Sequence, residues 1–322
     1  MSRTQTIDEA RLEDYRAELT GYCYRMLGSA FEAEDAVQET LMRAWRGLDN
    51  FDNRSSLRTW LYRIATNACL DMLKSRKRRA LPIDLSPAST ATAPLEEPLS
   101  NDTWIEPIPD GRVLPLSGDP SELAELRESI RLAFVAALQH LPPRQRAVLI
   151  LRDVLSWSAN EVADLLEISV ASANSALQRA RATLQSKDLS ATPQEPVTEA
   201  QNVLLTKYVD AFERYDIESF VTLLHEEFTQ AMPPYPMWLV GPDEAAAWML
   251  GPGIACKGSV LIPINVNGCP GFGQYRPSGP DGRHEPWAIH LVEIEGDRVA
   301  RITYFLDTNL FPLFGLPPHP GG

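Results

Sequence analysis

The stretch AEDAVQETLMRAWRGLDNFDNRSSLRTWLYRIATNACLDMLKSRKRR, which runs from Ala33 to Arg79, decides the fold. Apolar residues recur in it every three or four positions, which predicts amphipathic helices that bury one face. A first helix is expected over 34–48 and a second over 57–79. The core-facing stripe of the first helix consists of Val37, Leu41, Ala44, Trp45 and Leu48.

The second predicted helix carries a polar face that is rich in cations. Four polar side chains fall within a sector of about 60° if the helix continues to its end: Arg63, Asn67, Lys74 and Arg78. The basic run 74–79 adds Arg76. Clustered cations suit phosphates, and an amide can hydrogen-bond a base edge. A basic helix end is also often plain solvated surface, so the chemistry by itself leaves both interpretations open.

The whole stretch strongly resembles domain two of the extracytoplasmic-function RNA polymerase sigma factors. Two ordered motifs at the family's spacing carry this resemblance, AEDxVQExxxxAW and TWLYRIAxN. In that family the loop at 49–56 and the helix after it open the minus-ten promoter element, and Asn67 matches the position that contacts a base. The resemblance also implies that the first helix binds the clamp helices of the largest polymerase subunit through Asp35, Gln38, Glu39 and Arg43.

A second helical block is expected over 121–187. The wording SWSANEVADLLEISVASANSALQRARATL predicts two helices around a tight turn at 167–169, which is a helix-turn-helix. The polar residues of its second helix are the candidates for DNA contact: Ser172, Asn174, Ser175, Gln178 and Arg179.

This block resembles sigma domain four, which recognises the minus-thirty-five element and binds the polymerase flap. The segment LPPRQRAVLILRDV strengthens the match. The chain departs from the family where basic residues are usual, because it has Asn174 and Ala176 there, and this predicts weaker phosphate anchoring. The wording ANSALQRARATL resembles the members of the family that carry a fused SnoaL-like C-terminal domain.

Residues 199–322 fit that expectation, with helices first, then a strand, a helix over 242–250 and further strands. The resemblance implies an α+β SnoaL-like (nuclear transport factor two-like) cone, which would enclose a pocket for an unknown small-molecule ligand. An isomerase would need a carboxylate base in the cone, and the sequence places none there. The candidate pocket residues, whose packing alone would also explain them, are Tyr235, Trp238, Trp248, His290 and Asp307.

Two breaker-rich stretches separate the three domains (8–80, 121–187 and 199–322). We expect 81–120 to be an extended, proline-rich acidic linker, and 188–198 to be a short one. The net charge of −13 is concentrated in the linker 81–120 and in 188–322, which carry −6 and −10. An acidic domain could mask cations such as Arg78 and Arg179, and Trp104-Ile105-Glu106-Pro107 is a candidate docking strip.

The remaining features exclude several classes of protein. The four cysteines lack the spacing of a metal or redox site, and no catalytic residue, metal or cofactor is expected. No apolar run is long enough to span a membrane, and the N-terminus does not resemble a signal peptide, so a cytoplasmic protein is expected. Three functions stay open: a sigma factor modulated by its own C-terminal domain, an isomerase/cyclase-type enzyme or ligand sensor fused to DNA-binding domains, and a helix-turn-helix repressor.

The role of Asn67 can be tested with a library of minus-ten sequences. Asn67→Ala is expected to lose about 1–3 kcal/mol of base discrimination, because a side-chain amide can pair with a base edge. Lys74→Ala is the control, since a phosphate contact weakens all sequences alike. An unchanged base preference in the Asn67→Ala protein would remove this assignment.

Overall fold

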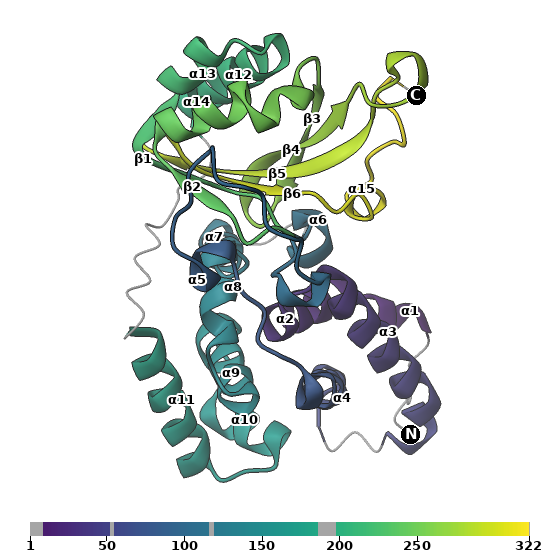
Figure 1. Ribbon diagram of the computed structural model, residues 1–322. Helices are drawn as coiled ribbons and strands as arrows, with labels where there is room; N and C mark the ends of the chain where they lie inside the picture. The colour runs from purple at the N-terminus through teal and green to yellow at the C-terminus, as the bar shows by residue number, and fades with distance from the viewer. Residues whose placement is uncertain (1–8, 52–54, 116–118, 186–197, 322) are drawn as a thin grey trace. The chain divides into compact units, whose positions relative to one another are not determined.

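The computed structural model describes residues 9–51, 55–115, 119–185 and 198–321. The described residues form two compact units. The helical unit combines residues up to Arg79 with those from Asp110, and the C-terminal unit combines Ala80–Pro109 with residues from 198 onward (Figure 1). No helix in the described part is long and apolar enough to cross a membrane.

Two helical domains make up the helical unit. The first contains α1 (Glu9–Glu13), α2 (Arg16–Leu27), α3 (Ala30–Gly47), α4 (Leu57–Met72) and the 3₁₀ turns Leu48–Asn50 and Leu73–Ser75. The second contains α6 (Asp110–Val113), α7 (Pro120–Glu128), α8 (Leu132–Gln139), α9 (Pro143–Leu149), a π turn (Ile150–Val154), α10 (Ala159–Leu166) and α11 (Val170–Gln185).

Serine caps begin the two long helices of the first domain. The Ser29 and Ser56 hydroxyls accept hydrogen bonds from the third backbone N–H of α3 and α4, which satisfies groups that have no partner inside the helix. The prediction of a helix as far as Arg79 is wrong, because α4 ends at Met72. After Met72 the chain leaves the helix and Arg76 and Arg79 pair with Glu32 of α3, so the shared face of Arg63, Asn67, Lys74 and Arg78 does not form.

The expected helix-turn-helix is present in the second domain. Ser158 and Glu161 form a capping box at the start of α10. Glu167 then adopts a left-handed conformation, with φ of 54°, and α11 begins three residues later. The turn therefore lies where the sequence predicted it.

Buried polar contacts join the two helical domains. The Arg25 side chain donates to the Ser129 hydroxyl at 2.6 Å, and the buried Arg146 guanidinium donates to the backbone oxygen of Met26. The rings of Tyr62 and Trp157 also pack with their centroids 5.0 Å apart. The two domains consequently form one packed unit.

The C-terminal unit is an α+β domain built on one six-stranded sheet of order β2-β1-β6-β5-β4-β3, in which only β1 and β6 run parallel. Its strands are β1 (Leu224–Ala231), β2 (Trp238–Val240), β3 (Val260–Val266), β4 (Cys269–Arg276), β5 (Glu285–Glu295) and β6 (Arg298–Phe305). Its helices are α5 (Pro82–Leu85), α12 (Glu199–Arg214), α13 (Ile217–Thr222), α14 (Pro242–Leu250), α15 (Leu310–Leu313) and the 3₁₀ turns Asn101–Thr103, Pro252–Cys256 and Pro280–Gly282. Helices α12–α14 lie over one face of the sheet (Figure 1).

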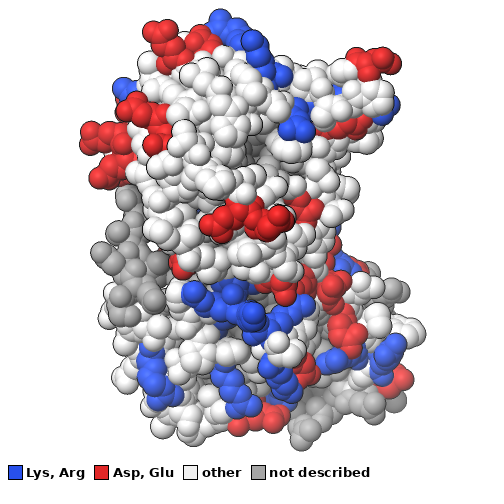
Figure 2. All heavy atoms as spheres, viewed as in Figure 1, with Lys and Arg blue, Asp and Glu red and all other residues white. Residues whose placement is uncertain are grey.

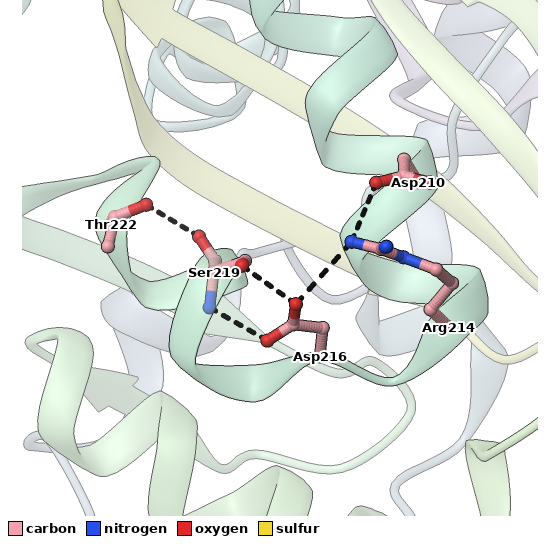
Figure 3. Close-up of polar contacts among 5 residues, drawn as sticks. All are labelled: Asp210, Arg214, Asp216, Ser219 and Thr222. Atoms are coloured by element: carbon pink, nitrogen blue, oxygen red, sulfur yellow. Dashed lines mark hydrogen bonds and ion pairs between the residues drawn. The ribbon is translucent and has the colours of Figure 1, made fainter.

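A polar turn sets the angle between α12 and α13 (Figure 3). Tyr215 ends α12 in a left-handed conformation, and the Asp216 carboxylate accepts the Ser219 backbone N–H at the start of α13. Arg214 bridges Asp210 and Asp216 at 2.9 and 3.4 Å. The turn directs Phe220 into the main core, next to Tyr208.

The segment Ala80–Pro109 belongs to the C-terminal unit rather than forming an extended linker; we call it the bound linker. Its backbone N–H groups at Ser89 and Leu99 donate to the oxygens of Trp238 and Pro234. The Ala91 N–H donates to the Glu244 carboxylate at 2.6 Å. The difference from the predicted linker has a physical reason, since the segment contains apolar side chains that become buried.

The bound linker turns back on itself. Ala80 and Trp104 pair as a β-bridge, and the Ala80 N–H donates to the Thr103 oxygen at 2.9 Å. Trp104 and Ile105 are 3% and 0% exposed and line a cavity with Phe305 and Leu310 of this unit, so the apolar part of the predicted docking strip is buried. At the far end, the Ile108 N–H donates to the Asn267 side-chain oxygen at 2.9 Å.

Trp104 should therefore stabilise the C-terminal unit. Trp104→Ala is expected to cost about 3–5 kcal/mol, the usual range for removing a buried aromatic side chain. Leu95→Ala is the control, because Leu95 lies in the same segment and is 45% exposed. Hydrogen exchange of the β5 and β6 amides measures the effect, and equal protection in the two variants would contradict it.

Candidate nucleic-acid interface

The four residues predicted to bind polymerase all lie on α3. Asp35, Gln38 and Arg43 are exposed, and Glu39 is partly exposed. Glu39 and Arg43 form an ion pair of 2.6 Å one helical turn apart. Such an exposed ion pair contributes little to the free energy of folding. Glu39 and Arg43 can therefore each leave it to contact a binding partner at a small cost in free energy.

Two apolar side chains on the same helix are also exposed. Trp45 is 62% exposed and Met42 is 39% exposed. The prediction that Trp45 packs in the core is wrong, because the small Ala44 beside it occupies the core position at 0% exposure. Hydrophobicity alone could not separate these neighbours, since both fit a broad apolar stripe.

On α4, Asn67 is exposed and Arg63 is only partly exposed. The Arg63 guanidinium donates to the backbone oxygen of Asp164, in α10, at 3.0 Å. Nearby, the Arg58 guanidinium lies 5.1 Å from the Trp157 ring centroid. In this arrangement Arg63, one of the cations that the sequence predicts to contact DNA, is bound to the second domain.

The basic run after α4 is largely paired within the helical unit. Lys74 contacts Asp71 at 2.7 Å, and Arg78 contacts the His140 ring at 2.5 Å. Arg76 and the buried Arg79 share the Glu32 carboxylate. The predicted contacts of Lys74, Arg76 and Arg78 with DNA would therefore have to replace existing partners.

The recognition helix α11 presents its predicted residues to solvent: Ser172, Asn174, Ser175, Gln178 and Arg179 are all exposed. Ala176 is 8% exposed and faces the core, so only Asn174 of the two unusual positions lies on the surface. Arg181, a further cation on α11 that the sequence did not single out, pairs with Asp153 of the π turn at 2.7 Å. Cations gather among acids over the helical unit in the view of Figure 2.

The five candidate pocket residues of the C-terminal unit do not share one pocket. Trp248 lines a cavity of about 50 Å³ beneath α14, together with Gln230, Gln274 and Tyr304. Asp307 lies apart, beside the bound linker, where it accepts a hydrogen bond from Asn101 at 3.2 Å. Tyr235 and Trp238 do not line this cavity. Tyr235 packs against the cluster of Met232, Met237 and Leu239, and the Trp238 indole N–H donates to the Ser86 oxygen.

His290 is fully buried behind this cavity. Its Nε2 contacts the Gln274 side-chain oxygen at 2.9 Å, and its Nδ1 contacts the Tyr208 hydroxyl at 3.0 Å. Burial lowers the pKa of His290 to about 3, so the ring is neutral at pH 7. A neutral ring has one donor, so Nε2 donates to Gln274 and Nδ1 accepts from Tyr208. His290, on β5, thus links Gln274 on β4 to Tyr208 on α12 inside the domain.

The sequence matches two known protein families at the two helical domains. Residues 12–79 match the family described as Sigma-70 region 2, and residues 131–184 match Sigma-70, region 4. Together with the helix-turn-helix and the exposed face of α3, these matches define the class of RNA polymerase sigma factors, which bind core polymerase and direct it to promoters.

Relatives narrow the class. The chain is 46% identical over 316 residues to the ECF RNA polymerase sigma factor SigG of Mycobacterium tuberculosis, covering 96% of this chain and 83% of SigG. It is 32% identical over 171 residues to the sigma factor SigW of Bacillus subtilis, covering 53% and 83%. The chain belongs to the extracytoplasmic-function (ECF) sigma factors, a family of transcription initiation factors.

A solved structure supports the fold over the whole chain. The crystal structure of the Mycobacterium tuberculosis sigma factor SigJ matches with a TM-score of 0.61 at 22% identity, and the match covers 96% of this chain and 100% of that one. The predicted order of two helical sigma domains followed by an α+β domain is confirmed.

The neutral state of His290 makes the C-terminal unit sensitive to acid. Its folded pKa of about 3 lies below the ordinary value of 6.5, so the unfolded chain binds the proton more tightly. The contribution of His290 is fully present above about pH 6.5. It should fall by about 1.4 kcal/mol per pH unit between about pH 6 and pH 4. In urea unfolding, the stability difference between wild type and His290→Gln should narrow over that range, and a constant difference would contradict this.

Proposed function

We propose that the α3 face of Asp35, Gln38, Glu39 and Arg43, extended by Met42 and Trp45, binds the polymerase clamp helices. An exposed tryptophan among polar side chains is typical of a protein interface, and this observation supports the placement. Asn67 then contacts a minus-ten base, and α11 lies in the major groove at the minus-thirty-five element. The second domain also contacts the polymerase flap.

We propose further that the C-terminal domain modulates this activity by capturing the linker. The bound linker is the covalent connection between the two sigma domains. Because Ala80 pairs with Trp104, the residues between them do not increase the distance that the linker can span. About five residues, 105–109, remain to separate the domains, which corresponds to roughly 20 Å of extended chain.

Promoter geometry requires more reach than this. The two promoter elements lie about 25 base pairs apart, or roughly 85 Å along a duplex at about 3.4 Å per base pair. All 30 residues of Ala80–Pro109 would span up to roughly 100 Å once released. Release of the linker from the C-terminal domain is therefore the step that lets both elements be bound together.

The packing of the helical unit acts in the same direction. The Arg63 contact with Asp164 and the Tyr62–Trp157 contact hold the second domain against the DNA-facing side of α4. A captured linker keeps the two domains at a high local concentration, which favours this closed arrangement. Capture and closure then stabilise one another.

For the cone we propose ligand binding rather than catalysis. The described residues that line the cavity of Trp248 include no Asp, Glu or His. Burial raises the pKa of the other acidic groups there, Tyr215, Tyr304 and Cys256, so they stay protonated at pH 7 and are poor general bases. Gln230 is 2% exposed, and its side-chain nitrogen has no hydrogen-bond partner among the described residues. A buried donor without a partner costs about 1–3 kcal/mol, which an acceptor oxygen on a neutral ligand would recover. A ligand sensor therefore fits this cavity better than an isomerase.

Run-off transcription with purified core polymerase, on a promoter selected from a randomised library, tests the capture of the linker. The variant Ser86→Ala/Asn101→Ala/Glu244→Ala removes three side-chain contacts of the linker without entering the sheet core. Losing them should weaken capture by about 2 kcal/mol and raise transcription up to about thirtyfold at limiting protein. Asp243→Ala, exposed beside Glu244, is the matched control and should leave transcription unchanged.

Salt separates linker capture from acidic masking of the DNA-binding cations. Removal of residues 199–322 should raise promoter binding under either mechanism. Masking predicts that the gain shrinks as salt rises, whereas capture through apolar burial and neutral hydrogen bonds predicts a gain that persists. The full chain with Asp35→Lys/Glu39→Lys should be inactive at every salt concentration. Equal transcription by the wild type and the triple variant would contradict capture.

A further inference from the structure

A cavity of about 200 Å³ in the helical unit is lined mainly by cations. Leu27 and the chain after α4 form one wall, and residues 139–146 of the second domain form the other. Five of its ten lining residues are basic, and no acid is among the described residues that line it. The five are Arg76, Lys77, Arg78, Arg79 and Arg146.

Nearby acids compensate only part of this charge. The Glu32 carboxylate pairs with both Arg76 and Arg79. Arg78 contacts an imidazole, which supplies no negative charge. Lys77 is exposed and makes no ion pair with any residue that the structure describes. The cavity therefore has an excess of positive charge.

Arg146 is the deepest of these cations. It is 4% exposed, and its terminal nitrogens donate to Gln139 and to backbone oxygens, which carry no net charge. Within the described part of the chain, its Nε has no hydrogen-bond partner. Burial lowers the pKa of Arg146 to about 10, because the charged form has lost its water. An anion beside this guanidinium would restore that lost stabilisation.

We propose that this cavity binds a small anion with a diphosphate group, such as free pyrophosphate or the terminal diphosphate of a nucleotide. Guanidinium groups present paired N–H donors that match phosphate oxygens. The cavity volume suits two linked phosphates. A duplex is too wide to enter a cavity of about 200 Å³.

The position of the cavity gives such an anion a consequence. Its walls come from both sigma domains, so the bound anion connects them and stabilises the closed arrangement. It also occupies Arg76 and Arg78, which the sequence predicts to contact DNA. Binding of the anion does not depend on the proposed function, whereas its effect on promoter recognition does.

Calorimetric titration of inorganic pyrophosphate into the full chain at constant ionic strength tests the proposal. Wild type should give saturable binding of one pyrophosphate per chain. Lys77→Ala/Arg78→Ala removes two charge-assisted contacts and should weaken binding at least about tenfold. Arg46→Ala is the matched control, because Arg46 is exposed on α3 and does not line the cavity, and it should bind as wild type does.

Two outcomes would overturn the proposal. The first is a negative titration: wild type shows no saturable binding, or the double variant binds pyrophosphate as tightly as wild type while its circular dichroism is unchanged. The second is that neither protein binds pyrophosphate, but the double variant binds a non-promoter duplex less tightly than wild type does. That result would assign the cations to the DNA backbone. Run-off transcription without added pyrophosphate tests the proposed function separately, so the two failures are distinguishable.

Discussion

The packing of the bound linker on the C-terminal unit is the interaction on which the arrangement of this sigma factor depends. Trp104 and Ile105 are buried and line a cavity with Phe305 and Leu310, and Ile108 is buried where its N–H donates to Asn267. Trp104, Ile105 and Ile108 lie in the connection between the two sigma domains, yet they are as buried as core residues. Apolar burial of this kind contributes roughly 1.5–3 kcal/mol for each large side chain. The linker between the two sigma domains thereby belongs to the C-terminal unit and not to the helical unit.

The position of the linker connects three features that are separate in the sequence: the reach of the linker, the contact of Arg63 with Asp164 and the basic cavity. The path of the linker limits how far the two sigma domains can move apart. That limit favours the contact of Arg63 with Asp164, which occupies a predicted DNA-facing cation. The same closure forms the basic cavity, because Arg146 comes from the second domain and Arg78 from the first. Under the proposed function, a change in any one of the three would therefore affect the others.

The cavity of the C-terminal unit has no Asp, Glu or His among the described residues that line it. His290 is the residue that might have suggested catalysis, but its pKa of about 3 and its two hydrogen bonds make it a neutral structural group. The unpartnered nitrogen of Gln230 is the feature that points to a ligand. Binding could then be coupled to the linker, since Met232 lines this cavity and also packs in the cluster that contains Ala91 of the bound linker.

The sequence by itself determined the helices, the helix-turn-helix, the α+β domain and the sigma family, because these follow from local periodicity, capping residues and ordered motifs. It placed the turn at Glu167 correctly, but it extended α4 beyond Met72 and put Trp45 in the core. Only the tertiary structure decided where 80–109 lies, which cations have partners, and that Trp248 and Asp307 line different cavities. These outcomes depend on contacts between residues far apart in the chain, such as Ala91 with Glu244 and Arg76 with Glu32, and no local pattern encodes such pairs.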